Sequence, residues 1–132
     1  MKIELPKFVP KGWGWESWLA NNELYCGKIL YVHRSKMCSY HYHKKKDETF
    51  YLLDGRIKLW YCHPSTYTLQ SRVDKIDHGV QIVMEPGDCF RLPPLTRHRF
   101  KGLADSHIIE ISTHHEEEDS YRLVDGDSQK GD

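Results

Sequence analysis

Runs rich in β-branched, aromatic and other apolar residues recur along the middle of the chain, and polar or turn residues separate them. No segment has a convincing helical period. The runs occupy residues 24–33, 37–43, 49–53, 56–61, 80–84, 89–92, 97–100 and 106–112. Asp54-Gly55 lies between two of these runs and is a strong signal for a β-hairpin. Many short strands at roughly regular spacing predict an all-β sandwich or barrel.

The two ends of the chain differ from this pattern. Residues 1–22 contain two prolines and two glycines, with a cluster of Trp13, Trp15 and Trp18, and we expect an irregular segment that packs on the barrel. The aromatic rings could instead stack on a sugar at the barrel mouth. We expect residues 23–124 to form the barrel and residues 125–132, which are acidic and contain Gly and Ser, to form a flexible tail.

Length and charge narrow the possible functions. A chain of 132 residues favours one domain, and the 19 basic side chains balance 19 acidic ones. Nucleic-acid binding requires a positive surface, and the chain as a whole has no excess of positive charge. The basic run Lys44–Lys46 is followed at once by Asp47 and Glu48, so we expect a solvated loop there.

The cysteines favour a reducing compartment. Three of the four cysteines lie inside strand-like runs, and none belongs to a C-x-x-C pair. No signal peptide and no apolar run long enough to cross a membrane is present. We therefore expect a cytoplasmic protein with reduced thiols and no membrane segment.

A set of metal-ligand side chains stands out from the strand pattern. His41 and His43 are two positions apart on a predicted strand, so both imidazoles project from the same face. Glu48 follows at the start of the next strand, and His98 lies just past a Pro-Pro turn. Three imidazoles and one carboxylate suit one divalent ion, either zinc, manganese, iron, cobalt or nickel. A His pair alone is more often structural, so the argument depends on the whole set.

The spacing of this set resembles the two sequence motifs of cupins. The first motif, G-x5-H-x-H-x(3–4)-E-x6-G, is matched from His41 through Glu48 to Gly55. The second, G-x5-P-x-G-x2-H-x3-N, is matched at Gly87, Pro93 and His98. Three non-ligand positions depart from the motifs, namely Ser35, Leu95 and Gly102. The resemblance implies a cupin barrel (a double-stranded β-helix or jelly roll) with a metal ion held by His41, His43, Glu48 and His98.

Segments outside the motifs are similar to the cupin domain of type II mannose-6-phosphate isomerases. They are residues 12–16, 25–29, 109–112 and 118–122. This resemblance implies aldose–ketose isomerisation of a sugar or sugar phosphate, in which a metal ion polarises the carbonyl and a base moves a proton. Lys28 and Glu110 are the candidates for the base, and Arg99 or Arg122 for binding a phosphate. Each also has a structural interpretation: Lys28 facing solvent, Glu110 paired with Arg99, and Arg122 holding the tail.

Other interpretations remain open at this stage. The same ligand set supports dioxygenase chemistry on other cupins, which would require a redox-active metal and an apolar pocket. A non-enzymatic sugar-binding or sensing domain is a third possibility. We expect a homodimer, because residues 1–22 are suited to pairing with a second copy. His114 and His115 point to opposite faces of a strand and are expected to lie on the solvated surface.

Overall fold

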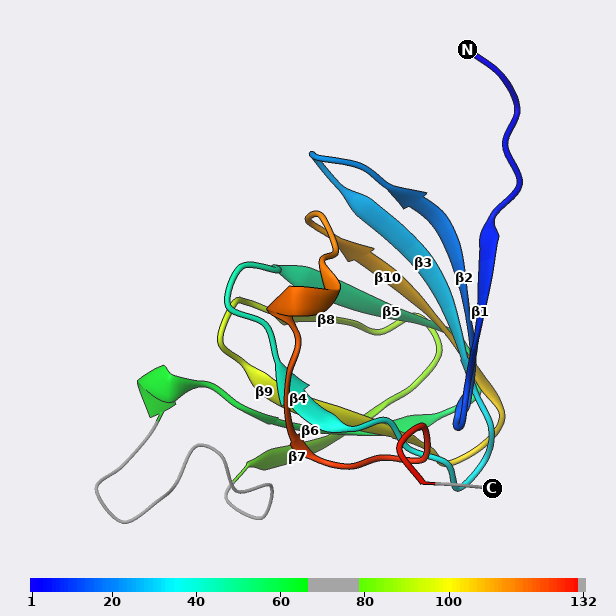
Figure 1. Ribbon diagram of the computed structural model, residues 1–132. Helices are drawn as coiled ribbons and strands as arrows, with labels where there is room; N and C mark the ends of the chain where they lie inside the picture. The colour runs from blue at the N-terminus through cyan, green and yellow to red at the C-terminus, as the bar shows by residue number, and fades with distance from the viewer. Residues whose placement is uncertain (67–78, 131–132) are drawn as a thin grey trace.

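The computed structural model describes residues 1–66 and 79–130, and within these residues every regular element is a strand or a short 3-10 turn (Figure 1). The polar stretch 67–78 and residues 131–132, the end of the expected tail, lie outside the described residues. The strands are β1 (Lys7–Lys11), β2 (Gly14–Asn21), β3 (Cys26–Val32), β4 (Tyr40–Tyr42), β5 (Glu48–Asp54), β6 (Ile57–Cys62), β7 (Val80–Met84), β8 (Cys89–Leu92), β9 (Arg97–Gly102), β10 (Ser106–Ser112) and β11 (Tyr121–Val124). The 3-10 turns are η1 (Pro64–Thr66) and η3 (Glu117–Asp119).

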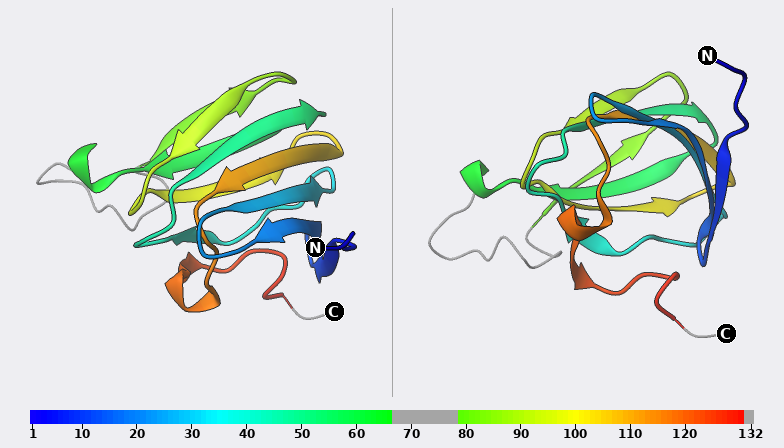
Figure 2. Two further views of the ribbon diagram at one scale, coloured as in Figure 1. Left: turned by 90° about the horizontal axis from the view of Figure 1, so that it is seen from above. Right: turned by 45° about the horizontal axis from the view of Figure 1, so that its top comes forward.

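The strands form two antiparallel sheets that face each other as the walls of a barrel (Figures 1 and 2). The six-stranded sheet has the order β1-β2-β3-β10-β5-β8, and the five-stranded sheet has the order β11-β4-β9-β6-β7. Strands far apart in the sequence pair with each other, such as β3 with β10 and β4 with β9. This arrangement confirms the predicted all-β jelly-roll barrel.

Alternation along the strands places one set of side chains between the sheets. In β3, every second residue from Cys26 to Val32 is buried. Leu52, Ile57, Leu59 and Ile108 are fully buried and form the centre of the apolar core. The same inward-facing positions elsewhere carry charged and imidazole side chains, so one part of the barrel interior is apolar and another is polar.

The Asp54-Gly55 turn joins the two sheets, so the predicted hairpin is wrong. Gly55 has a φ of 82°, and a Cβ there would lie 2.1 Å from Ser106 Oγ, so the turn requires glycine. However, β5 pairs with β10 and β8, whereas β6 pairs with β7 and β9. Asp54 accepts a hydrogen bond from His107 N at 2.9 Å, and this contact fixes the turn against β10 while the chain crosses to the other sheet.

The expectation of an irregular N-terminal segment is wrong for most of its length. Strands β1 and β2 pair with each other and extend the six-stranded sheet beyond β3. Pro10 is tolerated because β1 is an edge strand. Trp13, in the turn between the two strands, is buried and packs edge-on against Phe100 at 5.1 Å, which fixes the hairpin over the barrel.

The described residues of the predicted tail contact the barrel through hydrogen bonds. Asp127 exchanges two hydrogen bonds with the backbone of Met37, at 2.7 and 2.9 Å, and Arg99 donates to the carbonyl of Asp125 at 2.6 Å. These contacts hold the segment after β11 against the barrel. No helix in the described part of the chain is long and apolar enough to span a membrane.

Candidate metal centre

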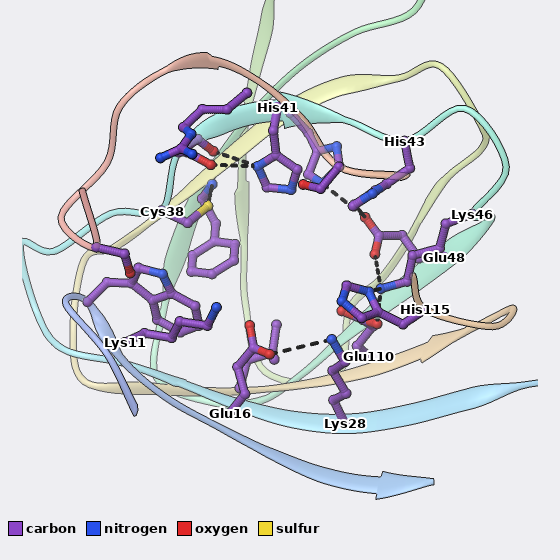
Figure 3. Close-up of a pocket in the computed structure, with 18 of the residues that line it drawn as sticks. Lys11, Glu16, Lys28, Cys38, His41, His43, Lys46, Glu48, Glu110 and His115 are labelled. Carbon is purple, nitrogen blue, oxygen red and sulfur yellow. Dashed lines mark hydrogen bonds and ion pairs between the residues drawn. The ribbon is translucent and has the colours of Figure 1, made fainter. Parts of the chain in front are cut away.

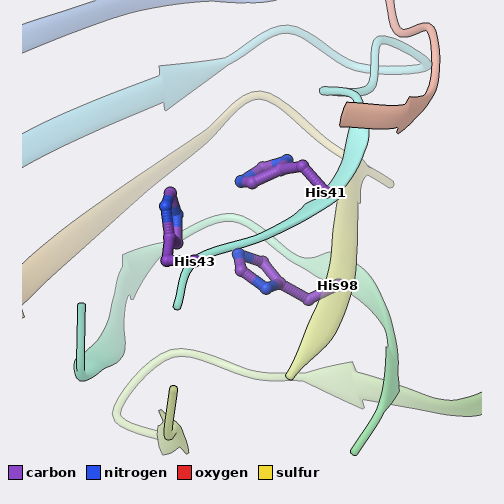
Figure 4. Close-up of side chains that lie close together, drawn as sticks. All are labelled: His41, His43 and His98. Carbon is purple, nitrogen blue, oxygen red and sulfur yellow. The ribbon is translucent and has the colours of Figure 1, made fainter. Parts of the chain in front are cut away.

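Three histidines converge at the polar end of the barrel interior (Figure 4). His41 on β4 pairs directly in register with His98 on β9, and His43 follows the end of β4. Each ring offers one nitrogen atom, and these three nitrogens lie within 4.8 Å of one another. The predicted alternation therefore places His41 and His43 on the same face, where His98 meets them.

Backbone carbonyl groups fix the orientation of all three imidazoles. The Nδ1 atoms of His41, His43 and His98 lie 2.8, 3.0 and 2.9 Å from the carbonyl oxygens of Ser39, Asp119 and Thr96. A carbonyl oxygen can only accept, so each Nδ1 carries the hydrogen and each Nε2 of a neutral ring has a free lone pair. This is the arrangement by which metal-binding histidines are oriented in proteins.

The surroundings keep two of these rings neutral. Burial, with the neighbouring His98 and His43, lowers the pKa of His41 well below its usual value. Burial likewise lowers the pKa of His43 to about 4. Both rings therefore present unprotonated Nε2 atoms near neutral pH, as metal binding requires.

Glu48 completes the set of candidate ligands. Its Oε1 atom lies 2.9 Å from Nε2 of His98 and 3.9 Å from Nε2 of His43, and it has no hydrogen-bond partner among the described residues. With the hydrogen of His98 on Nδ1, a carboxylate oxygen and an imidazole lone pair face each other, and a cation satisfies both. The residues present therefore fit a divalent ion.

A buried lysine links this candidate centre to a second carboxylate. Lys46 is 3% exposed, and its Nζ lies 2.6 Å from Glu110 Oε2, 3.5 Å from Glu48 Oε2 and 3.1 Å from His115 Nδ1. Burial alone would lower the pKa of Lys46, but the charges of Glu110 and Glu48 raise it, so the ammonium stays charged.

The expectation of a solvated loop at Lys44–Lys46 is therefore wrong for Lys46. Asp119 is the physical reason, because its carboxylate accepts hydrogen bonds from the backbone N–H groups of Lys44, Lys45 and Lys46, at 2.9 to 3.2 Å. These bonds curl the loop and turn the Lys46 side chain into the barrel. Lys45 stays at the surface, with 76% of its side chain exposed.

A further ion pair lies on the inner face of the six-stranded sheet. Lys28 Nζ lies 3.4 Å from Glu16 Oε1 and 4.3 Å from the centre of the Trp18 ring. Glu16 also accepts a hydrogen bond from Trp18 Nε1 at 2.7 Å. Lys28 is buried, so it does not face solvent.

One cavity of about 260 Å³ joins these groups (Figure 3). Its lining includes seven of the eight residues that the sequence singled out: His41, His43, Glu48, His98, Lys28, Glu110 and Arg122. Arg99 is the exception. It is buried outside the lining, where it donates to the carbonyl oxygens of Cys38 and Asp125 at 2.9 and 2.6 Å. Arg99 therefore holds the last part of the chain, and Glu110 pairs with Lys46 in its place.

His115 also lines the cavity, which corrects the expectation of a solvated His114–His115 pair. Its ring accepts from Lys46 through Nδ1, lies 3.1 Å from Glu117 Oε1 through Nε2, and packs edge-on against Trp18. Burial, followed by the charges of Lys46 and Lys28, lowers its pKa. Strand alternation does not apply to this pair, because β10 ends at Ser112 and both histidines follow it; of the two, only His115 lines the cavity.

Comparisons with known proteins agree with this geometry. A family described as the cupin domain matches residues 30–112. No curated protein sequence matches the chain. Among solved structures, KdgF from Halomonas sp. is similar with a TM-score of 0.62 and 18% identity, over 79% of this chain and 81% of that chain.

Two longer proteins also share the fold. The capsular polysaccharide assembling protein CapF from Staphylococcus aureus has a TM-score of 0.70 and 12% identity, over 92% of this chain and 33% of that chain. Bacillus subtilis oxalate decarboxylase, a protein with Mn(II) centres, has a TM-score of 0.72 and 13% identity, over 89% of this chain and 30% of that chain. The chain thus spans about a third of the length of these two proteins. At such identities the likeness shows the fold alone.

Proposed function

The chain belongs to the cupin family, and from this premise we propose that it is a metal-dependent isomerase that interconverts the aldose and ketose forms of a sugar or sugar phosphate. The observation that carries the proposal is a single cavity in which three oriented imidazoles and a carboxylate lie beside a second, lysine-bound carboxylate. The resemblance to mannose-6-phosphate isomerases in residues 12–16 and 118–122 supports the same activity.

His41, His43, His98 and Glu48 would hold one divalent ion, drawn from zinc, manganese, iron, cobalt and nickel. Such an ion supplies a Lewis acid that polarises the carbonyl oxygen of the substrate and stabilises negative charge there. Three of these four side chains, His43, Glu48 and His98, are buried.

Glu110 would move the proton between the two adjacent carbon atoms. It lies on β10 inside the cavity, where Lys46 and Ser112 donate to its Oε2 atom at 2.6 and 3.1 Å. These two contacts fix the plane of the carboxylate, and a fixed carboxylate is an efficient general base. Lys28, held by Glu16, lies on the neighbouring strand and would bind a substrate hydroxyl or act as the base in place of Glu110.

The polarity of the cavity favours a sugar over the apolar substrate that a dioxygenase of this family would take. Its lining contains four basic residues, Lys11, Lys28, Lys46 and Arg122, and four acidic ones, Glu16, Glu48, Glu110 and Glu117. Its apolar side chains are fewer and include Trp13 and Phe50, whose faces suit the carbon skeleton of a sugar.

We also propose a cytoplasmic homodimer. All four cysteines are free, as expected in a reducing compartment. On the outer face of the six-stranded sheet, Phe8, Leu53 and Ile111 are between 48% and 62% exposed, and Trp15 stacks on Tyr31. A second copy would cover these apolar groups. Light scattering after size-exclusion chromatography should give twice the monomer mass of 15.6 kDa, and a monomer at micromolar concentration would contradict this part of the proposal.

Metal content and sugar turnover test the proposal together. Protein purified without added metal is expected to contain close to one divalent ion per chain by elemental analysis, and the His41→Ala/His98→Ala variant should contain none. A screen of aldoses and their phosphates should reveal isomerisation that Glu110→Gln abolishes without loss of the metal. Iron content with oxygen consumption would favour the dioxygenase, and sugar binding without turnover would favour a sensing domain.

A further inference from the structure

The charged side chains of the cavity balance one another before a metal ion is considered. Four basic and four acidic residues line it, which sum to zero with the imidazoles neutral. A divalent ion at the candidate centre adds two positive charges. Because buried charge requires a partner, the loaded cavity favours a ligand with negative charge over a neutral one.

The cations of the cavity fall into two groups that differ in their partners. Lys28 and Lys46 are buried and held by carboxylates, at 3.4 Å for Glu16 and 2.6 Å for Glu110. Lys11 forms no ion pair within 4.0 Å in the part of the chain that the structure describes. Its charge helps to lower the pKa of Glu117, but the closest partner of that carboxylate is His115, and the Glu117 side chain is 73% exposed. Lys11 is therefore available to a ligand.

Arg122 similarly lacks a strong ion-pair partner among the described residues. Its nearest acidic partner is Asp125, 3.9 Å away, and the two side chains are 49% and 71% exposed, so the pair contributes little. In the sheet, Arg122 on β11 lies in register beside His41 on β4. An anion held by Arg122 would therefore lie close to the metal centre.

The segment after β11 connects these two cations. Gly12, the neighbour of Lys11, donates a hydrogen bond to Ser128 Oγ at 3.0 Å, so this segment reaches the β1–β2 turn. Gln129 lines the cavity and accepts from Gly126 N through Oε1 at 2.8 Å, which leaves its amide NH2 to donate. Figure 3 shows Lys11 entering the cavity on the side opposite Lys46 and Glu48.

We infer that Lys11 and Arg122 form an oxyanion-binding subsite at the mouth of the cavity, so that the ligand carries a phosphate or carboxylate group. Resting on the proposed function, this inference selects acidic or phosphorylated sugars over neutral ones. The anionic group lies between β1 and β11, with Gln129 as a further donor, and the hydroxyl and carbonyl oxygens of the sugar extend toward the histidines. Lys11 is then a specificity-determining residue.

Calorimetric titration of the metal-loaded protein with inorganic phosphate and, separately, with acetate tests the subsite. We expect Lys11→Met and Arg122→Met each to weaken binding of the favoured anion about tenfold or more. Lys7→Met is the matched control, since Lys7 lies on the same strand, contacts the Trp18 ring and does not line the cavity. The control should bind as the unchanged protein does. Circular dichroism and metal content verify that each variant is folded and loaded.

The titration separates this inference from the proposed function. Equal anion affinity in the unchanged protein, Lys11→Met and Arg122→Met would overturn the subsite, as would no anion binding at millimolar concentration, even if metal binding and sugar isomerisation are found. Conversely, anion binding that depends on both residues supports the subsite even where no sugar is turned over. The stronger of the two anions identifies the group as phosphate or carboxylate.

Discussion

The two sheets form opposite walls of the cavity, and the two walls differ in chemical character. The five-stranded sheet contributes His98 and His41, which with His43 place one ring nitrogen each within 4.8 Å of the others, and backbone carbonyl groups orient the rings. The six-stranded sheet contributes charged groups that are already paired, Lys28 with Glu16 and Glu110 with Lys46 from the adjoining loop. Most of the side chains on both walls are buried. The first wall therefore offers ring nitrogens that fit a cation, whereas the charged groups of the second wall pair with one another.

Glu48 lies where the two walls meet. Its Oε1 atom faces His98 and its Oε2 atom faces Lys46, at 2.9 and 3.5 Å. A metal ion bound through Oε1 would thus be connected through one carboxylate to Lys46 and on to Glu110. A substitution on either wall should therefore affect the side chains of the other wall, and single substitutions can test this coupling.

The largest effect is expected from Lys46→Met, which removes an ion-pair partner from the charged groups beside the six-stranded sheet. It leaves Glu48 and Glu110 as buried carboxylates without their ammonium partner, and removing one partner of a buried ion pair costs about 3–5 kcal/mol. Urea unfolding of the metal-free protein measures the loss. Lys45→Met is the control, because the exposed pair with Glu116 should contribute at most about 1 kcal/mol. Equal stability of the two variants would contradict a stabilising role for the ion pairs of Lys46.

His98→Ala removes a candidate metal ligand from the wall formed by the five-stranded sheet and should act mainly on metal binding. Changes to groups that only orient metal ligands cost about 10–100-fold in affinity, so loss of a ligand should cost at least about 100-fold. Competition with a chromophoric chelator gives the dissociation constant. His33→Ala, at an exposed histidine, should leave it unchanged. A variant that retains full affinity would exclude His98 as a ligand.

Asp119→Ala removes the carboxylate that holds the Lys44–Lys46 loop, and it should have the smallest effect. Three backbone N–H groups lose their acceptor, and we expect a loss of about 1–2 kcal/mol in the free energy of unfolding, since water replaces part of these bonds. Metal affinity should fall only slightly, because the Asp119 carbonyl oxygen still accepts from His43. The same urea titration, with exposed Glu118→Ala for comparison, checks this. Stability equal to that of Glu118→Ala would contradict the role of Asp119.

The three histidines, Glu48, Lys28 and Glu110 were predictable from sequence as residues that line the cavity, but Lys46 and Glu16, the ion-pair partners of Glu110 and Lys28, were not. His41, His43 and His98 lie at a spacing that recurs in a known family, and strand alternation fixes the face of the first two. Lys46 and His115 sit in polar runs whose neighbours are solvated, so no local pattern distinguishes them. The burial of Lys46 depends on Asp119 and Glu110, which lie more than sixty residues from it in the sequence. Such long-range capping leaves no periodic signal.

The strands at residues 7–21 were missed for a different reason. Proline and glycine interrupt the segment, and such residues usually mark loops. At the outermost position of a sheet, however, one side of the strand needs no partner, so Pro10 costs little. The burial of Trp13 against Phe100 and the register with β3 then fix the hairpin. Edge strands are therefore harder to predict than central ones.

The contact between Gly12 and Ser128 has a consequence for how the molecule assembles. It joins residues 116 positions apart, and a Cβ at Gly12 would lie 2.1 Å from the carbonyl oxygen of Asp127, so the two segments meet backbone to backbone. Contacts of such large sequence separation slow folding, because the entropy of closing the loop is lost before any packing is gained. All four candidate ligands precede residue 99, so they can gather before this closure. Closure of the Gly12–Ser128 contact would then complete the proposed anion subsite after the candidate ligands have come together.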